Sequence, residues 1–195
     1  MYPGLENLRN LTVRFTPLRT SFPFSKMMTL FTNLKRSNAF LSSLTISKSA
    51  NSGAYTQLSH PFIEHIVNTY GDSLTELLFC GLITQEESLP LICERCTELE
   101  TLTVPFPPNQ DVSIRFASRW RSALTVFQSQ SRLVYAIEKA RSLHTLIHND
   151  AHRTGHTWDR SRNALQHYVD YLFDVARDLR IMEVDGVRFE VCIPS

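Results

Sequence analysis

Four histidines recur at four-residue intervals in the carboxy-terminal third of the chain, at His144, His148, His152 and His156. On a single helix this spacing would place the four imidazoles on one face, where Asp150 and Asp159 are near enough in sequence to help them hold a zinc ion. Residues 144–156 therefore support the hypothesis of a metal-binding or metal-dependent domain. The competing hypothesis is a polar loop, because Asn, Asp, Thr and Gly residues within this segment are typical of turns. We favour the loop and predict no bound metal and no cofactor.

A pair of cysteines, Cys93 and Cys96, has the spacing of half a zinc site or of a redox-active pair. The sequence contains no second pair at zinc-finger spacing, and both residues fall on the apolar face of a predicted helix. We therefore predict small, buried and unreactive thiols. With Cys80 and Cys192, the four cysteines are too few and too scattered for a disulfide framework. We therefore expect reduced thiols. Reduced thiols are typical of an intracellular protein, which would be located in the cytoplasm, the nucleus or both.

The sequence lacks the motifs of common catalytic sites. It contains no Gly-x-Ser-x-Gly, no glycine-rich phosphate loop and no His-Glu-x-x-His. Its six glycines are also few for a glycine-rich nucleotide-binding loop. We therefore predict a protein that is not an enzyme.

Charge and hydropathy narrow the range of partners. The 195 residues carry 20 Lys and Arg against 19 Asp and Glu, a net charge of +1, without runs of like charge. Such a chain is not expected to bind nucleic acid or an anionic membrane surface. The sequence has no apolar stretch long enough to span a bilayer, and its first residues do not have the pattern expected of a signal peptide. With 43% hydrophobic residues, it can form the core of one domain, residues 1–195.

The elements that position any functional residue are predicted by one repeated pattern. Its unit is Leu, two residues, Leu or Met, one residue and then an apolar residue, with a single polar exception at His148. The six copies begin at Leu8, Leu41, Leu74, Leu99, Leu143 and Leu179. Anchors two residues apart alternate as in a strand with one buried face, and several such strands side by side can share one core.

The segments between the anchors predict helices, which parallel strands need as crossovers. Apolar residues recur at helical spacing within residues 26–36, 62–70, 88–96, 133–140 and 164–176. The sequence thus predicts an α/β fold, a leucine-rich-repeat solenoid of about six irregular repeats with a parallel sheet on the concave side and helices on the convex side. The alternative is an ordinary α/β domain, whose buried strands usually read as unbroken Val and Ile runs; here Thr12, Thr45 and Thr103 occupy alternate positions.

Residues 105–130 interrupt the repeated pattern. Pro105, Pro107 and Pro108 end the fourth predicted strand. After them, residues 112–116 alternate like a strand, whereas residues 116–127 suit a helix. The segment is either a degenerate repeat or an irregular insertion.

The predicted binding surface is the concave face of the sheet, formed by strand residues that alternate with the buried anchors. These residues are expected to face a protein target, although strand residues of this kind are also simply solvated. They are Asn10, Thr12, Arg14, Ser43, Thr45, Glu76, Leu78, Thr101, Thr103, Thr145, Ile147, Asn149, Ile181 and Glu183, with Ser47, Cys80 and Asp185 continuing the same face.

Residues 73–81 and 88–102 resemble the cysteine-containing leucine-rich repeats of F-box proteins. The order of features in residues 96–184 is similar to the carboxy-terminal half of many fungal F-box proteins. It comprises a Leu-Glu-x-Leu strand, a proline-containing insertion, an Ala-Arg-x-Leu strand at residues 140–143, a His-rich loop and a final repeat. The resemblance covers nearly the whole chain.

This resemblance implies the substrate-recognition part of an F-box-type ubiquitin-ligase receptor. Such a receptor holds a protein target on its repeats and docks a Skp-type adaptor through the F-box. No F-box fits before the first anchor at Leu8, so the adaptor is expected only if an upstream F-box exists. The alternatives are a stand-alone repeat protein without a link to a ligase and the metal-binding domain based on residues 144–156.

Overall fold

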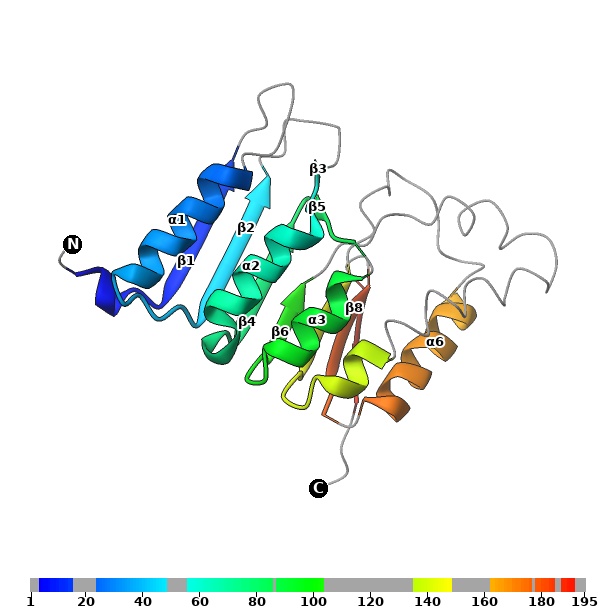
Figure 1. Cartoon of the computed structure of the whole chain (residues 1–195). Coiled ribbons are helices and arrows are strands. Elements are labelled where there is room, and N and C mark those ends of the chain that lie inside the picture. The colour runs from blue at the N-terminus through cyan, green and yellow to red at the C-terminus, as the bar shows by residue number, and fades with distance from the viewer. Residues whose placement is uncertain are drawn as a thin grey trace.

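The computed structural model describes residues 4–15, 24–48, 56–85, 87–103, 135–148, 162–176, 178–184 and 187–191. In this part of the chain, seven strands form one sheet, and the helices lie along one of its faces (Figure 1). The strands follow the chain order across the sheet: β1 (Asn10–Phe15), β2 (Ser43–Lys48), β4 (Glu76–Cys80), β6 (Thr101–Thr103), β7 (Thr145–His148), β8 (Ile181–Val184) and β9 (Val187–Glu190).

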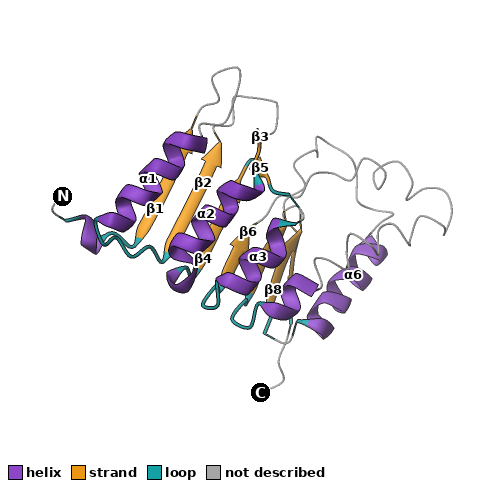
Figure 2. Cartoon of the chain, viewed as in Figure 1, coloured by secondary structure: helices purple, strands orange, loops and turns teal. Residues whose placement is uncertain are grey.

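The helices and the strands form two separate layers (Figure 2). The described helices are α1 (Phe24–Arg36), α2 (His60–Tyr70), α3 (Ser88–Arg95) and α6 (Arg162–Val175), and residues 135–139 are also helical. The sequence predicts a helix at each of these positions, and the structure confirms them. Short elements complete the described part: the 3-10 turns η1 (Leu5–Asn7) and η2 (Gly71–Ser73), and the strands β3 (Thr56–Gln57) and β5 (Leu82–Ile83), which pair with each other.

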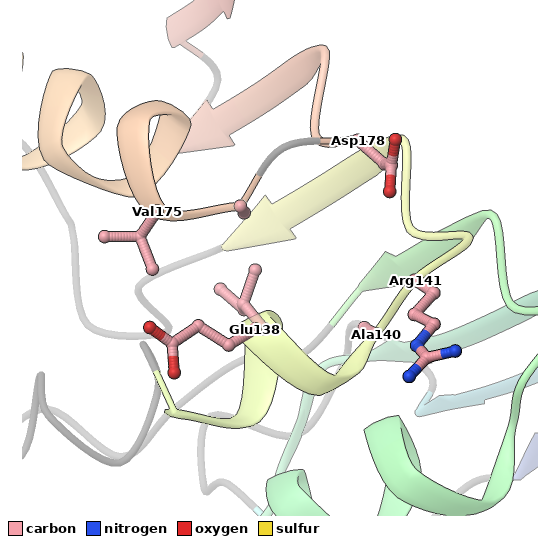
Figure 3. A pocket seen from close by; sticks show the side chains of 7 residues that line it. Glu138, Ala140, Arg141, Val175 and Asp178 are labelled. Carbon is pink, nitrogen blue, oxygen red and sulfur yellow. The ribbon is translucent and has the colours of Figure 1, made fainter.

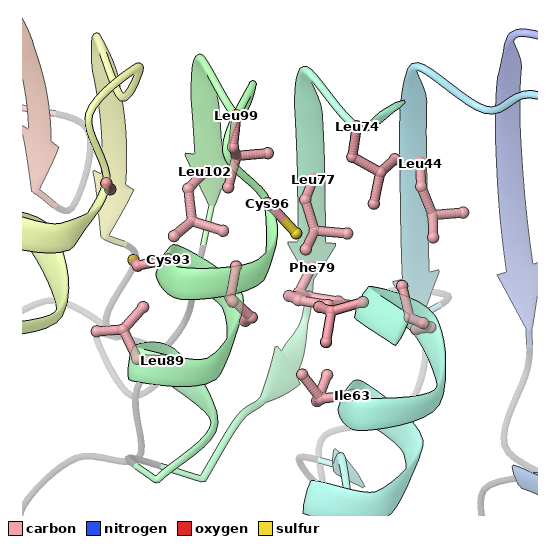
Figure 4. Packing of buried hydrophobic residues seen from close by; sticks show 14 of the residues in the cluster. Leu44, Ile63, Leu74, Leu77, Phe79, Leu89, Cys93, Cys96, Leu99 and Leu102 are labelled. Carbon is pink, nitrogen blue, oxygen red and sulfur yellow. The ribbon is translucent and has the colours of Figure 1, made fainter. Parts of the chain in front are cut away.

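The register of the sheet aligns the leucine anchors. Neighbouring strands are parallel except for β8 and β9, which are antiparallel. One line across five strands consists of Leu44, Leu77, Leu102, Leu146 and Met182, all fully buried. Figure 4 shows three of them packed between the strands and the helices. Leu11 continues the line in β1 but is only half-buried, because β1 has a described neighbour strand on one side only.

A repeated hydrogen-bond pattern fixes the start of each following strand. The carbonyl oxygen of Arg9 accepts the backbone N–H groups of both Ser42 and Ser43, at 2.8 and 3.0 Å. The same arrangement recurs at four later carbonyls, those of Ser42, Thr75, Glu100 and His144. Because a single carbonyl group orders the first residues of the next strand, the register does not depend on how long the connection between the strands is.

The apolar faces of the helices close the core over the sheet. Phe31 of α1 lies between Phe62 and Tyr70 of α2, with ring centroids 6.1 and 6.4 Å away. The Tyr70 hydroxyl donates a hydrogen bond to the carbonyl oxygen of Phe31 at 2.9 Å, and burial raises the pKa of Tyr70 to about 12. Just beyond α2, a Cβ atom on Gly71 would lie 2.8 Å from the carbonyl oxygen of Arg95, so only glycine allows this close approach to the end of α3.

The prediction of an α/β fold with a mostly parallel sheet is confirmed. Strand β9 and the β3–β5 pair are additions that the sequence did not predict. Val104, the third anchor of its copy, and residues 105–130 lie outside the described residues. None of the helices in the described ranges combines the length and the apolar character needed to cross a bilayer.

Truncation of Leu77 to Ala is expected to destabilise the fold strongly. Its side chain is fully buried, and the cavity left by such a truncation typically costs about 2–5 kcal/mol. Chemical denaturation followed by circular dichroism measures the change in the free energy of unfolding. Leu78→Ala is the matched control, because Leu78 is only half-buried on the opposite face of the same strand, and its loss should be about 1 kcal/mol. Equal losses at the two positions would contradict this assignment of the faces.

Candidate functional site

The candidate site is the face of the sheet opposite the helices, which we call the open face. Its residues alternate along each strand with the buried anchors. The first line across the open face consists of Asn10, Ser43, Glu76, Thr101, Thr145, Ile181 and Glu190. The second line consists of Thr12, Thr45, Leu78, Thr103, Ile147, Glu183 and Arg188.

The register brings together almost all of the surface residues that the sequence predicts. Arg14 lies on a third, shorter line with Ser47 and Cys80. Asn149 and Asp185 lie outside the described residues. A surface predicted from residues far apart in the sequence is therefore continuous over the described strands.

Burial varies along the two lines. Asn10 and Thr12 are exposed in β1, whereas most residues of the central strands are half-buried. Thr103 is only 4% exposed and lies in register between two half-buried aliphatic side chains, Leu78 and Ile147. The middle of the open face is therefore more apolar and less solvated than the alternation of residues alone predicts.

The described strands carry few charged side chains on the open face, and only some of these side chains form ion pairs. The Glu76 carboxylate accepts a hydrogen bond from the Ser43 hydroxyl of the neighbouring strand. Arg188 lies opposite Glu183 in the register, but its guanidinium pairs with Glu190 two residues further along β9. Within the described ranges, neither Glu76 nor Glu183 forms an ion pair.

The third line of the open face carries two further polar groups. Ser47 is 8% exposed, and its hydroxyl has no hydrogen-bond partner in the part of the chain that the structure describes. Cys80 is an exposed free cysteine, and partial burial of its sulfur raises the pKa of the thiol. These groups extend the open face toward the carboxyl ends of β1, β2 and β4.

Strand β9 adds residues that sequence reasoning missed. Glu190 and Arg188 extend the first and second lines by one strand. A signal for β9 is present in the sequence, because the dipeptide Asp185-Gly186 is typical of two-residue hairpin turns and Val187 and Phe189 alternate after it.

The histidines do not share a helix in the described residues. His144 is exposed and immediately precedes β7, and His148 is the last residue of that strand. His152, His156, Asp150 and Asp159 lie outside the described residues. Over the residues that are described, no group of three or more His, Cys, Asp or Glu side chains is placed to hold a metal ion.

Cys93 and Cys96 lie within the apolar layer between α3 and the sheet (Figure 4). Burial is the main cause that raises the pKa of both thiols, to about 12 for Cys96 and further for Cys93, where Cys96 and Glu94 add to the effect. Thiols held in the protonated form are poor nucleophiles and poor metal ligands. Their environment agrees with the predicted structural role.

One hollow among the described residues lies on the helix side of the sheet. This hollow of about 210 Å³ lies between residues 137–141 and the end of α6, below the range of about 300–1,000 Å³ that is usual for ligand sites (Figure 3). Glu138, Arg141 and Asp178 line it. Elsewhere on the same side of the sheet, His60 Nδ1 contacts the Ser88 hydroxyl at 3.0 Å, but Ser88 is fully buried, so this contact joins α2 to α3 rather than presenting a nucleophile.

Comparison with known proteins leaves the family open, because no family model matches the chain and no curated protein matches it significantly. The open face, with its register, burial and charges, is therefore the basis for a functional proposal.

Alkylation with iodoacetamide at mildly alkaline pH is expected to modify Cys80 well before Cys93 and Cys96. Cys80 is exposed, whereas the other two thiols are buried and their pKa values are strongly raised. Peptide mass mapping over a time course measures the three rates, and the same reaction in denaturant is the control in which all three should react. Rapid modification of Cys93 or Cys96 in the folded protein would contradict their structural role.

Proposed function

We propose that the chain is a leucine-rich-repeat array that acts as a non-enzymatic scaffold for binding proteins, with the open face as its concave binding surface. The observation that carries this proposal is the register, which aligns the residues beside each leucine anchor into two continuous lines. Successive repeats that each contribute one strand would produce such lines, because every repeat contacts only its neighbours.

The arrangement of elements supports a repeat array of about six irregular units over an ordinary α/β domain. A doubly wound domain places helices on both faces of its sheet and reverses its strand order at a switch point. In the described ranges, the helices cover one face, and the strand order follows the chain without reversal. The carbonyl pattern at the strand starts also recurs from one strand to the next, as expected for related structural units.

The chemistry of the open face favours a protein over a small molecule as the ligand. The face is broad, and it combines hydroxyl groups, half-buried aliphatic side chains and isolated charges. Protein interfaces combine such polar and apolar groups over a large area, whereas small ligands require an enclosed cavity.

The resemblance of residues 73–81 and 88–102 to F-box repeats supports a more specific role within this proposal. The chain would be the target-holding part of a ubiquitin-ligase receptor in the cytoplasm or the nucleus. Its target would lie on the open face, and a Skp-type adaptor would bind only through an F-box upstream of the repeats.

A photo-reactive amino acid on the open face is expected to capture the protein target in living cells. Benzoylphenylalanine replaces Thr45 or Thr145, both half-buried on the open face, one at a time in the full chain. Glu64 and Asp174 are matched control positions, because they are exposed on the helices. Immunoblots detect the adducts, and mass spectrometry identifies them. Adducts that form only from Glu64 or Asp174 would overturn the assignment of the binding surface.

The ligase role predicts that a Skp-type adaptor copurifies with the endogenous protein from its own cells. The physical reason is that the adaptor binds the F-box and not the repeats, so its presence reports an upstream segment. Quantitative mass spectrometry of the purified complex measures the ratio of adaptor to chain. If the adaptor is absent while the photo-crosslinked target persists, the scaffold role stands and the ligase role fails.

A further inference from the structure

Two glutamates on the open face lack a cation from the described part of the chain. Glu76 lies on the first line in β4, and Glu183 lies on the second line in β8; both are half-buried. Arg188, the cross-strand neighbour of Glu183, is already paired with Glu190. A carboxylate that is partly removed from water interacts more strongly with a cation than a fully solvated one does, because the local dielectric constant is lower.

The described strand residues between these glutamates on the open face are uncharged. The described open-face residues of β6 and β7 are Thr101, Thr103, Thr145 and Ile147. Thr103 is only 4% exposed, so the groups of this strip that a ligand can reach belong to the half-buried Thr101, Thr145 and Ile147. A ligand that spans the strip therefore meets an acidic, an apolar and again an acidic position.

The spacing of the glutamates defines the length of such a ligand. Strands β4 and β8 are separated by β6 and β7, which gives three steps of about 4.8 Å, and the two lines are about 6.6 Å apart along the strands. The diagonal distance is therefore about 16 Å. Four residues of extended chain cover about 13 Å, and the flexible stems of two Lys or Arg side chains span the remainder.

The pattern of side chains follows from the geometry of an extended segment. Residues i, i+2 and i+4 of an extended chain point to the same side. We propose that the open face binds an extended protein segment with basic residues at i and i+4, which pair with Glu76 and Glu183, and an aliphatic residue at i+2, which contacts the half-buried Ile147. The inference rests on the proposed scaffold function and adds the chemistry of the target. A nucleic acid does not fit, because its phosphates would face both carboxylates.

The test uses a fluorescent peptide, Gly-Ser-Thr-Lys-Thr-Val-Thr-Lys-Thr-Ser-Gly, and the full chain. The control peptide, Gly-Ser-Thr-Lys-Thr-Val-Lys-Thr-Thr-Ser-Gly, has the same composition, but its second Lys points to the other side. Fluorescence anisotropy measures the two dissociation constants. The first peptide is expected to bind about tenfold more tightly than the control peptide, because only it can form both ion pairs.

Charge-removing variants assign the contacts. Glu76→Gln and Glu183→Gln are each expected to weaken binding of the first peptide by about fivefold. Glu64→Gln removes the same charge from an exposed position on α2 and should leave binding unchanged. Circular dichroism confirms that the variants remain folded.

Three results would overturn the proposal: equal affinity for the two peptides, no binding of either, or an equal loss in the Glu64→Gln variant. Photo-crosslinking from Thr45 or Thr145 then shows whether only the proposed basic ligand is wrong or whether the scaffold function is wrong as well. If those positions still capture a protein target, the scaffold stands and only the basic character of the target is wrong. If they capture none, the scaffold function itself fails.

Discussion

Burial of one leucine per strand between the sheet and the helices is the interaction on which the rest of the structure depends. Leu44, Leu77, Leu102 and Leu146 are register partners and are fully buried. Because side chains alternate with a period of two, a slip of one residue in any strand would turn its leucine outward and bring a residue of the open face into the core. The core therefore also decides which residues reach the open face.

The two edges of the described sheet differ in the exposure of their apolar side chains and in their charges. At one edge, Leu11 and Val13 of β1 remain half-buried, with apolar groups accessible to solvent. At the other edge, β9 runs antiparallel and carries the exposed ion pair between Arg188 and Glu190. Charged side chains on an edge strand oppose pairing with further strands, so the β9 edge is better protected from association than the β1 edge.

Leucine spacing predicts the six parallel strands β1, β2, β4, β6, β7 and β8 and their open-face residues, and the helical spacing of apolar residues predicts the helices, because burial imposes a short-range periodicity on the sequence. Strand β9 and the β3–β5 pair were not predicted. Contacts between strands were not predictable in this way. Thr103 is only 4% exposed, although Thr101 on the same face of the strand is half-buried, and the Ser43–Glu76 hydrogen bond joins residues 33 positions apart. The Cys93 and Cys96 spacing, which fits either a metal site or a core, was interpreted correctly as core only because the surrounding residues predicted an apolar helix face.

Glu76 and Glu183 are informative because neither forms an ion pair among the described residues. Both are half-buried on the open face, so their carboxylates are partly removed from water. Thr101 and Thr145 continue the same line as Glu76 with uncharged hydroxyl groups, so a carboxylate is not required for a strand residue at this place in the register. Under the proposed function, a basic ligand would supply a cation to each carboxylate, and the partial burial of both groups would strengthen these ion pairs.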